Sequence, residues 1–210
     1  EREMVQKIID YLVALEYWHD EDNGIWEENM EVHASSIGSC VAALKKAAQL
    51  PWITVPEQAI LLGEQALREL LPRESKTKFA DLALLSLIYP FAVTAEEETL
   101  AILRNVEYHL TRERGVIRYK LDRYYNNNED GYSEEAEWCF GLAWLAIIYA
   151  ERGEKEKAYY YLRKAKATVT PDGLIPELYY SNTDRPNGNT PLGWAESMYV
   201  VALKKVSDLG

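Results

Sequence analysis

Apolar side chains recur along this chain with the three- and four-residue spacing of amphipathic helices. This spacing predicts a helix over residues 2–17, a second over about 35–49, and a third that Pro56 opens and Pro72 ends. A fourth segment, from Phe79 to Tyr89, is apolar nearly all round, which is typical of a helix buried on most sides. The first half of the chain therefore predicts four helices.

The second half of the chain continues the same pattern. Thr94 and Glu97 have the spacing of a capping box and precede a fifth helix that reaches Leu110. Three more helices are predicted over residues 136–150, 154–168 and 191–206. No segment carries a convincing strand pattern, so the chain is predicted to be all-α, with about eight helices.

The connections between these helices alternate in length and composition. Residues 18–32, 111–132 and 169–189 form long connections rich in aromatic and acidic residues, and 72–76 is short but strongly polar. The connections between them are short and bland. Because odd-numbered connections share one end of an up-and-down array, we expect these four loops to meet on one face, where loops often carry function. No period of about 34 residues indicates a helical repeat.

The length and composition fit one globular domain over residues 1–210. The chain has 210 residues, 48% of them apolar, which is enough for a substantial core. Its formal charge of −11 argues against a nucleic-acid groove or an anionic membrane as partner, because both reward clustered lysine and arginine.

The aromatic content is biased toward rings that carry a hydrogen-bonding group. Tryptophan (6) and tyrosine (15) outnumber phenylalanine (3). Sugar-binding clefts use such rings, and so do many protein cores. Each of five aromatic residues individually suits a core or rim position, and collectively they would suit the apolar faces of glucose rings: Trp18, Trp138, Tyr179, Tyr180 and Trp194.

The two cysteines, Cys40 and Cys139, both fall inside apolar helical patterns, where a free thiol behaves as a small hydrophobe. We therefore expect a reducing, cytoplasmic location. Neither an apolar run of about 18 residues nor a secretory leader is visible. The chain begins at Glu1 without methionine, which suggests a processed product or a fragment.

Two loops present carboxylates beside turn-forming and apolar residues. The first is Asp22-Asn23-Gly24-Ile25-Trp26-Glu27-Glu28, and the second is Gly173-Leu174-Ile175-Pro176-Glu177. The bland alternative is that these glutamates are solvated or structural loop charges. The three histidines, at positions 19, 33 and 109, make no metal-binding set, so no metal or cofactor is predicted.

Several motifs, taken in order along nearly the whole chain, resemble the glucoamylase family (glycoside hydrolase family 15) and the related alpha subunit of phosphorylase kinase. They are Gly24-Ile25-Trp26-Glu27-Glu28, His33-Ala34-Ser35-Ser36-Ile37-Gly38-Ser39-Cys40, Pro72-Arg73-Glu74-Ser75, Val116-Ile117-Arg118-Tyr119 with Tyr124-Tyr125, Glu137-Trp138, Gly173-Leu174-Ile175-Pro176-Glu177 and Asn189-Thr190-Pro191-Leu192-Gly193-Trp194. Each motif is weak alone, and their ordered combination is fairly specific.

The resemblance implies an (α/α) barrel, a toroid of helical hairpins, that hydrolyses an α-glucosidic bond with inversion. It gives Glu27 the position of the general acid and Glu177 that of the general base. It also implies that Arg118 and Tyr119 contact sugar hydroxyls and that Trp26 lines the wall beside the acid.

The remaining site residues are Glu28 and Trp138, which we expect in the substrate-binding wall. Which of Glu27 and Glu28 is the buried carboxylate is left open by the sequence. Arg118 has an equally good alternative as a structural partner of Asp122 or Glu137, because arginine pairs with carboxylates in a fork geometry.

The chain shows about eight of the family's twelve helices, so the opening helices of the barrel are expected to be absent. An open barrel of this kind is expected to form a homo-oligomer or to pair with a chain that supplies the missing helices. The motifs Ala34-Ser35-Ser36 and Thr190-Pro191-Leu192-Gly193-Trp194 resemble the kinase-subunit branch of the family more than the glucoamylases. Three functions therefore compete: a glucosidase acting on α-linked gluco-oligosaccharides, a non-catalytic carbohydrate-sensing or regulatory module, and a scaffold for protein contacts.

Overall fold

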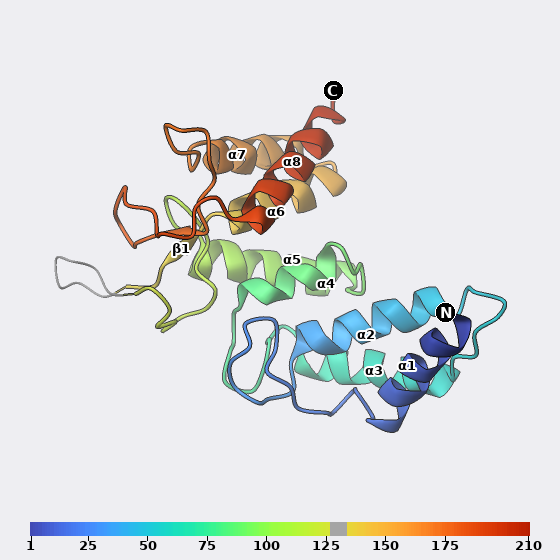
Figure 1. Cartoon of the computed structure of the whole chain (residues 1–210). Helices are drawn as coiled ribbons and strands as arrows, with labels where there is room; N and C mark the ends of the chain where they lie inside the picture. The colour runs from blue at the N-terminus through green and yellow to red at the C-terminus, as the bar shows by residue number, and fades with distance from the viewer. Residues whose placement is uncertain (127–133) are drawn as a thin grey trace. The chain divides into compact units, whose positions relative to one another are not determined.

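The computed structural model describes residues 1–126 and 134–210, and the fold of this part of the chain is all-α, as predicted (Figure 1). The eight α-helices in the described residues are α1 (Arg2–Ala14), α2 (Ala34–Ala47), α3 (Glu57–Leu70), α4 (Leu85–Ile88), α5 (Glu96–Asn105), α6 (Phe140–Glu151), α7 (Lys155–Lys166) and α8 (Gly193–Ser207). A 3₁₀ turn, η1 (Leu82–Leu84), precedes α4, and a π-helical turn, η2 (Val106–Leu110), extends α5. Residues 127–132 of the predicted fifth connection lie outside the described residues.

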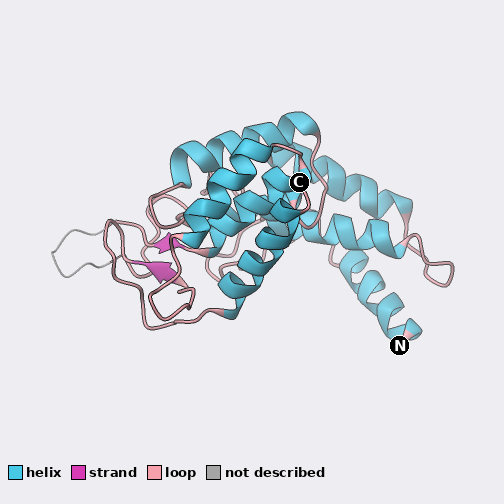
Figure 2. Cartoon of the chain, turned by 90° about the horizontal axis from the view of Figure 1, so that it is seen from above, coloured by secondary structure: helices cyan, strands magenta, loops and turns pink. Residues whose placement is uncertain are grey.

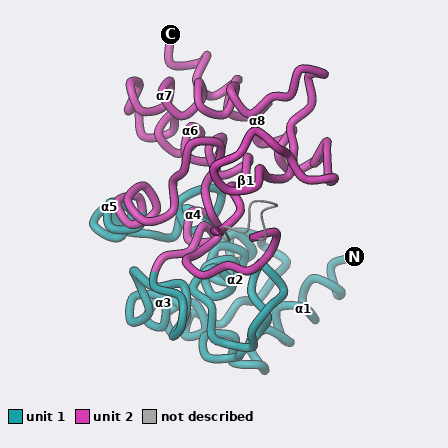
Figure 3. The backbone as a smooth tube through the Cα atoms, turned by 90° about the vertical axis from the view of Figure 1, so that its left-hand side faces the viewer, with its two compact units in different colours: residues 1–79, 86–102 teal, residues 80–85, 103–210 magenta. Residues whose placement is uncertain are grey.

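The chain divides into two compact units (Figure 3). Unit 1 comprises Glu1–Phe79 and Ser86–Ile102, and unit 2 comprises Ala80–Leu85 and Leu103–Gly210. Each unit contains one of the two carboxylate loops predicted from the sequence, so each is described by itself below.

In unit 1 the helices α2 and α3 pack side by side (Figure 1). Buried Ile37, Val41 and Leu44 form the inner face of α2, at the spacing that the sequence predicts. Tyr17 lies close against α3, because a Cβ on Gly63 of α3 would lie 2.1 Å from the hydroxyl oxygen of Tyr17. That hydroxyl donates to the carbonyl oxygen of Ala59 at 2.9 Å and so ties the segment after α1 to α3.

In unit 2 the helix α6 is buried along almost its whole length, from Phe140 to Ala150. It packs against α7 and α8, which accounts for an apolar pattern without a polar face. A Cβ on Gly141 would lie 2.6 Å from the Cβ of Val116, so only glycine lets this loop approach the helix. The strongly apolar helix is thus covered within unit 2 rather than by a second chain.

Two segments differ from the sequence-based prediction. Glu137 and Trp138, expected in the sixth helix, form strand β1 (Glu137–Trp138), which pairs antiparallel with β2 (Leu178–Tyr179) (Figure 2). The expected fourth helix over 79–89 is shortened to η1 and α4, because Asp81 caps the backbone N–H of Ala83 at 2.7 Å and starts the helical turn there.

Helix α1 leaves large apolar side chains exposed. Met4, Ile8 and Tyr11 are 67%, 54% and 62% exposed, and their spacing of four and three residues places them in one stripe. In the described residues, no helix has the length and apolarity needed to cross a membrane.

Candidate functional site

The acidic loop of unit 1 is a short hairpin closed by Asp22 and Glu31. Each of these residues donates its backbone N–H to the other's carbonyl oxygen, at 2.9 and 3.0 Å. Inside the hairpin, the side chain of Asp22 accepts from the N–H of Gly24, and the amide of Asn23 donates to the carbonyl oxygen of Glu28 at 2.6 Å. These Asx-type bonds set the turn that carries Trp26 and Glu27.

Glu27 is exposed at the tip of this hairpin and has a left-handed backbone, with φ of +54°. Such a conformation is uncommon for a residue other than glycine and costs of order 1 kcal/mol. Its N–H donates to the carbonyl oxygen of Gly24 at 3.2 Å, and Trp26 beside it is half-buried. Glu27 is therefore presented to solvent by a backbone that the surrounding hydrogen bonds impose.

Glu28, not Glu27, is the more buried carboxylate of the pair. Its Oε2 lies 3.0 Å from Nζ of Lys78, and this lysine is only 7% exposed. The partner comes from the polar segment that follows α3. Of the two adjacent glutamates, Glu28 is thus engaged in an ion pair, and Glu27 is the carboxylate directed outward.

A buried His33–Glu74 pair fastens the same hairpin to the segment after α3. Nδ1 of His33 lies 3.5 Å from Oε1 of Glu74, and Nε2 lies 3.3 Å from the carbonyl oxygen of Asn29. Both side chains are at most 3% exposed. The hydrogen bond with Glu74 raises the pKa of His33, and burial opposes it. The first and third connections therefore meet inside unit 1, as predicted.

Unit 2 builds its loops into a small ladder of backbone hydrogen bonds. Val116 pairs with Trp138 of β1, at 3.0 and 3.1 Å, and Trp138 stands opposite Leu178 of β2. On the other side of β2, Asn187 donates its N–H to the carbonyl oxygen of Leu178 at 3.1 Å. The fifth and seventh connections therefore meet inside unit 2.

Arg118 is buried and forms a fork with Asp122. Its Nε and Nη2 each lie 2.7 Å from one carboxylate oxygen of Asp122, which is 1% exposed. The guanidinium carbon lies 5.0 Å from the ring centroids of both Tyr124 and Trp138, and these two rings stack at 5.7 Å. Arg118 therefore pairs with Asp122, one of the two carboxylate partners that the sequence offered, and its contact with a sugar stays a prediction.

Glu177 stands directly before β2 and is held by two asparagines. Its Oε2 accepts from Nδ2 of Asn187 at 2.6 Å and from Nδ2 of Asn189 at 2.7 Å. Its carbonyl oxygen accepts from the N–H of Cys139 at 3.1 Å, which anchors the backbone to the start of α6. Burial, and after it the charge of Glu177, raises the pKa of Tyr124. The carboxylate of Glu177 is thus held by two side-chain donors, and its backbone is held by Cys139.

The other two predicted site residues of unit 2, Trp138 and Tyr119, lie beside Arg118. Trp138 is 5% exposed and contributes to the core as well as to the stack on Tyr124. Tyr119 is half-buried, pairs with Asp81 through an isolated β-bridge, and lies 5.7 Å from the guanidinium of Arg118. Unit 2 therefore gathers Arg118, Tyr119, Trp138 and Glu177, while unit 1 gathers Trp26, Glu27 and Glu28.

Sequence reasoning missed Lys78, Tyr124 as a stacking partner, and the two asparagines. Lys78 gives no local signal, because it is recognisable only by its buried partner some fifty residues away. The Asn187-Gly188-Asn189 segment looks like an ordinary turn. The sequence did offer one signal for these donors. Two asparagines flank a glycine in the loop that follows the candidate base.

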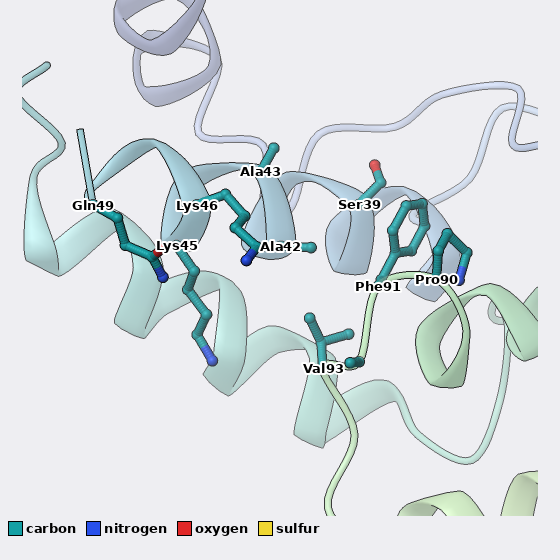
Figure 4. Close-up of a pocket in the computed structure, with 10 residues that line it drawn as sticks. Ser39, Ala42, Ala43, Lys45, Lys46, Gln49, Pro90, Phe91 and Val93 are labelled. Carbon is teal, nitrogen blue, oxygen red and sulfur yellow. The ribbon is translucent and has the colours of Figure 1, made fainter. Parts of the chain in front are cut away.

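A separate pocket of about 470 Å³ lies on unit 1, between α2 and the turn that precedes α5 (Figure 4). Its lining includes Ala42, Lys46 and Gln49 of α2 and Phe91 and Val93 of the turn. It contains none of the carboxylates or aromatic residues named above, so it lies apart from the candidate site. Within residues 1–126 and 134–210, no cluster of three or more potential metal ligands is present.

No family model matches the chain. Among curated proteins, it is 27% identical to the probable phosphorylase b kinase regulatory subunit alpha of Caenorhabditis elegans and 29% identical to the skeletal muscle isoform of that subunit from Oryctolagus cuniculus. Both alignments cover 94% of this chain and 20% of the relative. The chain therefore spans about a fifth of the length of the curated relatives it matches.

Solved structures with a similar fold are glycosidases and glucoamylases. A wild-type glycosidase matches with a TM-score of 0.74 and 21% identity, over 95% of this chain and 58% of the glycosidase. A glycosidase in complex with glucose matches with the same TM-score and coverage at 20% identity. A bacterial glucoamylase complexed with acarbose matches with a TM-score of 0.70 and 17% identity, over 98% and 37% of the two chains. At these identities the likeness establishes the fold.

Proposed function

Because the chain has a glucoamylase-like fold and a sequence similar to phosphorylase kinase alpha subunits, we propose that it is a glycoside hydrolase of the glucoamylase type. The substrate class is α-linked glucose oligosaccharides, and the reaction is hydrolysis with inversion at the anomeric carbon. The same likeness supports treating residues 1–210 as one glucoamylase-like domain, since the structural matches span both units.

The observation that carries this proposal is the environment of Glu177. Two amide N–H groups donate to its carboxylate at 2.6 and 2.7 Å and hold it in one orientation. An ionised, oriented carboxylate is what activation of water requires. The aromatic group of Tyr124 and Trp138 beside it suits the apolar face of a glucose ring.

For the general acid we propose Glu27 rather than Glu28. The carboxylate of Glu28 is engaged in an ion pair with Lys78, whereas Glu27 is exposed at the tip of the hairpin. In an inverting mechanism the acid protonates the leaving oxygen while the base takes a proton from water on the opposite face of the sugar. Inverting enzymes in general need about 6.5–9.5 Å between their two carboxyl groups, which leaves room for the water.

The substrate-binding residues in this proposal are Trp26, Glu28, Arg118, Tyr119 and Trp138. Trp26 supplies ring surface, the buried Trp138 acts by stacking on Tyr124, and Tyr119 supplies a hydroxyl beside Arg118. Because the Arg118–Asp122 fork is buried, Arg118 also fixes the aromatic rings that face the sugar. Glu28 is tied to Lys78 and would act at the edge of the site.

A second candidate function is a non-catalytic module that senses carbohydrate or regulates a partner. The specific observation in its favour is the name of the curated relatives, which are regulatory subunits of a kinase and align with 94% of this chain. The two functions differ in whether bound sugar is hydrolysed. A partner chain or a second copy would find an apolar contact in the exposed stripe Met4, Ile8 and Tyr11 of α1.

The deciding experiment measures hydrolysis and binding on the same preparation. Maltose and maltotetraose are incubated with the purified protein, and the optical rotation is followed, because inversion releases β-glucose first. Binding of the same sugars is measured by calorimetry. Release of β-glucose supports the hydrolase. Tight binding without release of glucose overturns the hydrolase in favour of the carbohydrate-sensing module. If the protein neither binds the sugars nor releases glucose, both the hydrolase and the carbohydrate-sensing role are overturned.

A further inference from the structure

We infer that Asn187 and Asn189 are positioning residues that hold Glu177 by one oxygen, Oε2, so that the other oxygen, Oε1, takes the proton from the attacking water. The inference rests on the proposed role of Glu177 as general base and assigns a function to two side chains that have none so far. In the step concerned, an O–H bond of water breaks and its proton passes to Oε1. The water oxygen bonds to the anomeric carbon while the glycosidic bond from that carbon to the leaving oxygen breaks, and the leaving oxygen takes a proton from Glu27.

Both amides donate to the same carboxylate oxygen. The Nδ2 atoms of Asn187 and Asn189 lie 2.6 and 2.7 Å from Oε2. Two donors on one oxygen fix the rotation of the carboxylate, which a single donor would leave loose. Among the described residues, the hydrogen bonds to Glu177 leave Oε1 without a side-chain donor. Oε1 is therefore the oxygen with lone pairs available for water.

The backbone explains why two asparagines reach one oxygen. Asn189 accepts the N–H of Glu177 with its carbonyl oxygen at 3.1 Å, and Asn187 donates its N–H to Leu178 at 3.1 Å. The segment thus runs alongside Glu177 and β2, and the backbone bends at Gly188, between the two asparagines. Gly188 lies between them and carries no side chain. The backbone hydrogen bonds beside β2 therefore fix where the two asparagines lie relative to Glu177.

Within the described part of the chain, the side chain of Asn187 keeps a buried oxygen without a hydrogen bond, which costs folding free energy. It is 4% exposed, and its Oδ1 is buried without a hydrogen-bond partner among the described residues. A buried acceptor left unsatisfied is unfavourable, and a native protein seldom keeps one without a reason. The opposite amide orientation would place Oδ1 against the Glu177 carboxylate, so Nδ2 must face it. The unsatisfied oxygen is the consequence of turning the donor toward Glu177.

The other polar groups near Glu177 do not replace these donors. Burial, followed by the charge of Glu177, raises the pKa of the Tyr124 phenol, so this side chain gives no donor that is ionised near neutral pH. The guanidinium of Arg118 forms its fork with Asp122. The two amides are therefore the side-chain donors that set the orientation of Glu177.

The test compares three variants in the maltose assay. Asn189→Ala removes one donor from an exposed position, where folding is secure. Asn187→Asp keeps the shape of a buried side chain but sets a second carboxylate beside the first, so that the pair shares a proton. Asn182→Ala is the control, because the amide of Asn182 bonds Glu134 instead of Glu177. Thermal unfolding and acarbose binding are measured for all three.

For Asn189→Ala we expect kcat to fall about 10- to 100-fold with KM nearly unchanged, as expected for a base that is less well held. The acid limb of the kcat/KM profile, which reports protonation of the base, should move about one unit to higher pH. Asn187→Asp should move it further, and Asn182→Ala should leave both quantities unchanged.

Two results overturn the inference, and they are distinguishable. If the wild type hydrolyses maltose and Asn189→Ala and Asn187→Asp keep its kcat and its acid limb, the positioning role fails while the proposed function stands. If the wild type binds acarbose and hydrolyses nothing, the proposed function fails, and the positioning role fails with it because no base exists to be positioned.

Discussion

Lys78 and Glu28 form an ion pair in which Nζ lies 3.0 Å from Oε2, with the lysine 7% exposed and the glutamate a quarter exposed. The pair joins the acid hairpin to the segment after α3. Lys78→Met removes the charge that compensates Glu28 and should lower the free energy of unfolding by about 1–3 kcal/mol, between the values for exposed and fully buried pairs. Urea unfolding measures the loss.

The control for this pair is the double variant Lys78→Met with Glu28→Gln. Because no uncompensated charge then remains, part of the lost stability should return, and a double-mutant cycle gives the coupling. A cycle in which the two single changes simply add would show that the ion pair does not hold the hairpin.

The two candidate catalytic carboxylates yield a second prediction. Glu27→Gln removes the proton donor and Glu177→Gln removes the base, and loss of either typically costs about 10²–10⁴ in rate. Glutamine keeps the size and much of the hydrogen bonding of glutamate, so acarbose affinity should change little. Rates of glucose release and calorimetric affinities check this. Unchanged turnover in both variants would contradict the roles given to them.

A third prediction concerns pH and His33. Because Glu74 raises the pKa of His33 above its ordinary 6.5, the folded state binds this proton more tightly than the unfolded state. The stabilisation is fully present below pH 6.5 and is lost as pH rises through the raised folded value. The free energy of unfolding of the wild type should therefore fall with rising pH in this window.

The matched variant is His33→Gln, which keeps a hydrogen-bonding side chain without a titration near neutrality. Its unfolding free energy should be flatter with pH in the same range. The series is run above pH 5.5, since Glu31 acts oppositely at lower pH: burial raises its pKa, but hydrogen bonds from Ser75 and Thr77 lower it overall. Equal slopes in wild type and variant would exclude His33 as the source.

A fourth prediction separates the structural and functional parts of Arg118. Arg118→Met leaves the buried Asp122 without its partner and should destabilise the fold by about 3–5 kcal/mol. Arg118→Met combined with Asp122→Leu removes both charges and should recover most of this loss. If the recovered double variant still binds maltose as the wild type does, the guanidinium serves structure alone.

Local periodicity was enough to predict the helices, because their burial follows the apolar stripe. It failed at Glu137 and Trp138, which form β1 through pairing with residues 116 and 178, far away in sequence. An apolar run cannot reveal such pairing. The fourth helix was overpredicted for a related reason, since the side chain of Asp81 starts a tight turn inside the apolar run.

The candidate site was predictable as loops and not as contacts. Turn residues beside carboxylates marked the loops of Glu27 and Glu177. Which glutamate of the first loop is paired depends on Lys78, and which amides hold Glu177 depends on the ladder beside β2. These are relationships between distant residues, so no window along the sequence contains them.

The left-handed backbone at Glu27 sets fold stability and function against each other at this position. Stability favours glycine there, whereas the proposed acid role requires glutamate. Glycine adopts φ near +54° without the steric cost that a side chain carries there. A lineage that no longer needed the carboxylate would therefore gain by drifting to glycine or asparagine at this position. If function requires the carboxylate, glutamate should be found at this position in most related sequences despite the backbone preference for glycine. The frequency of glutamate there can be counted in an alignment without any assay.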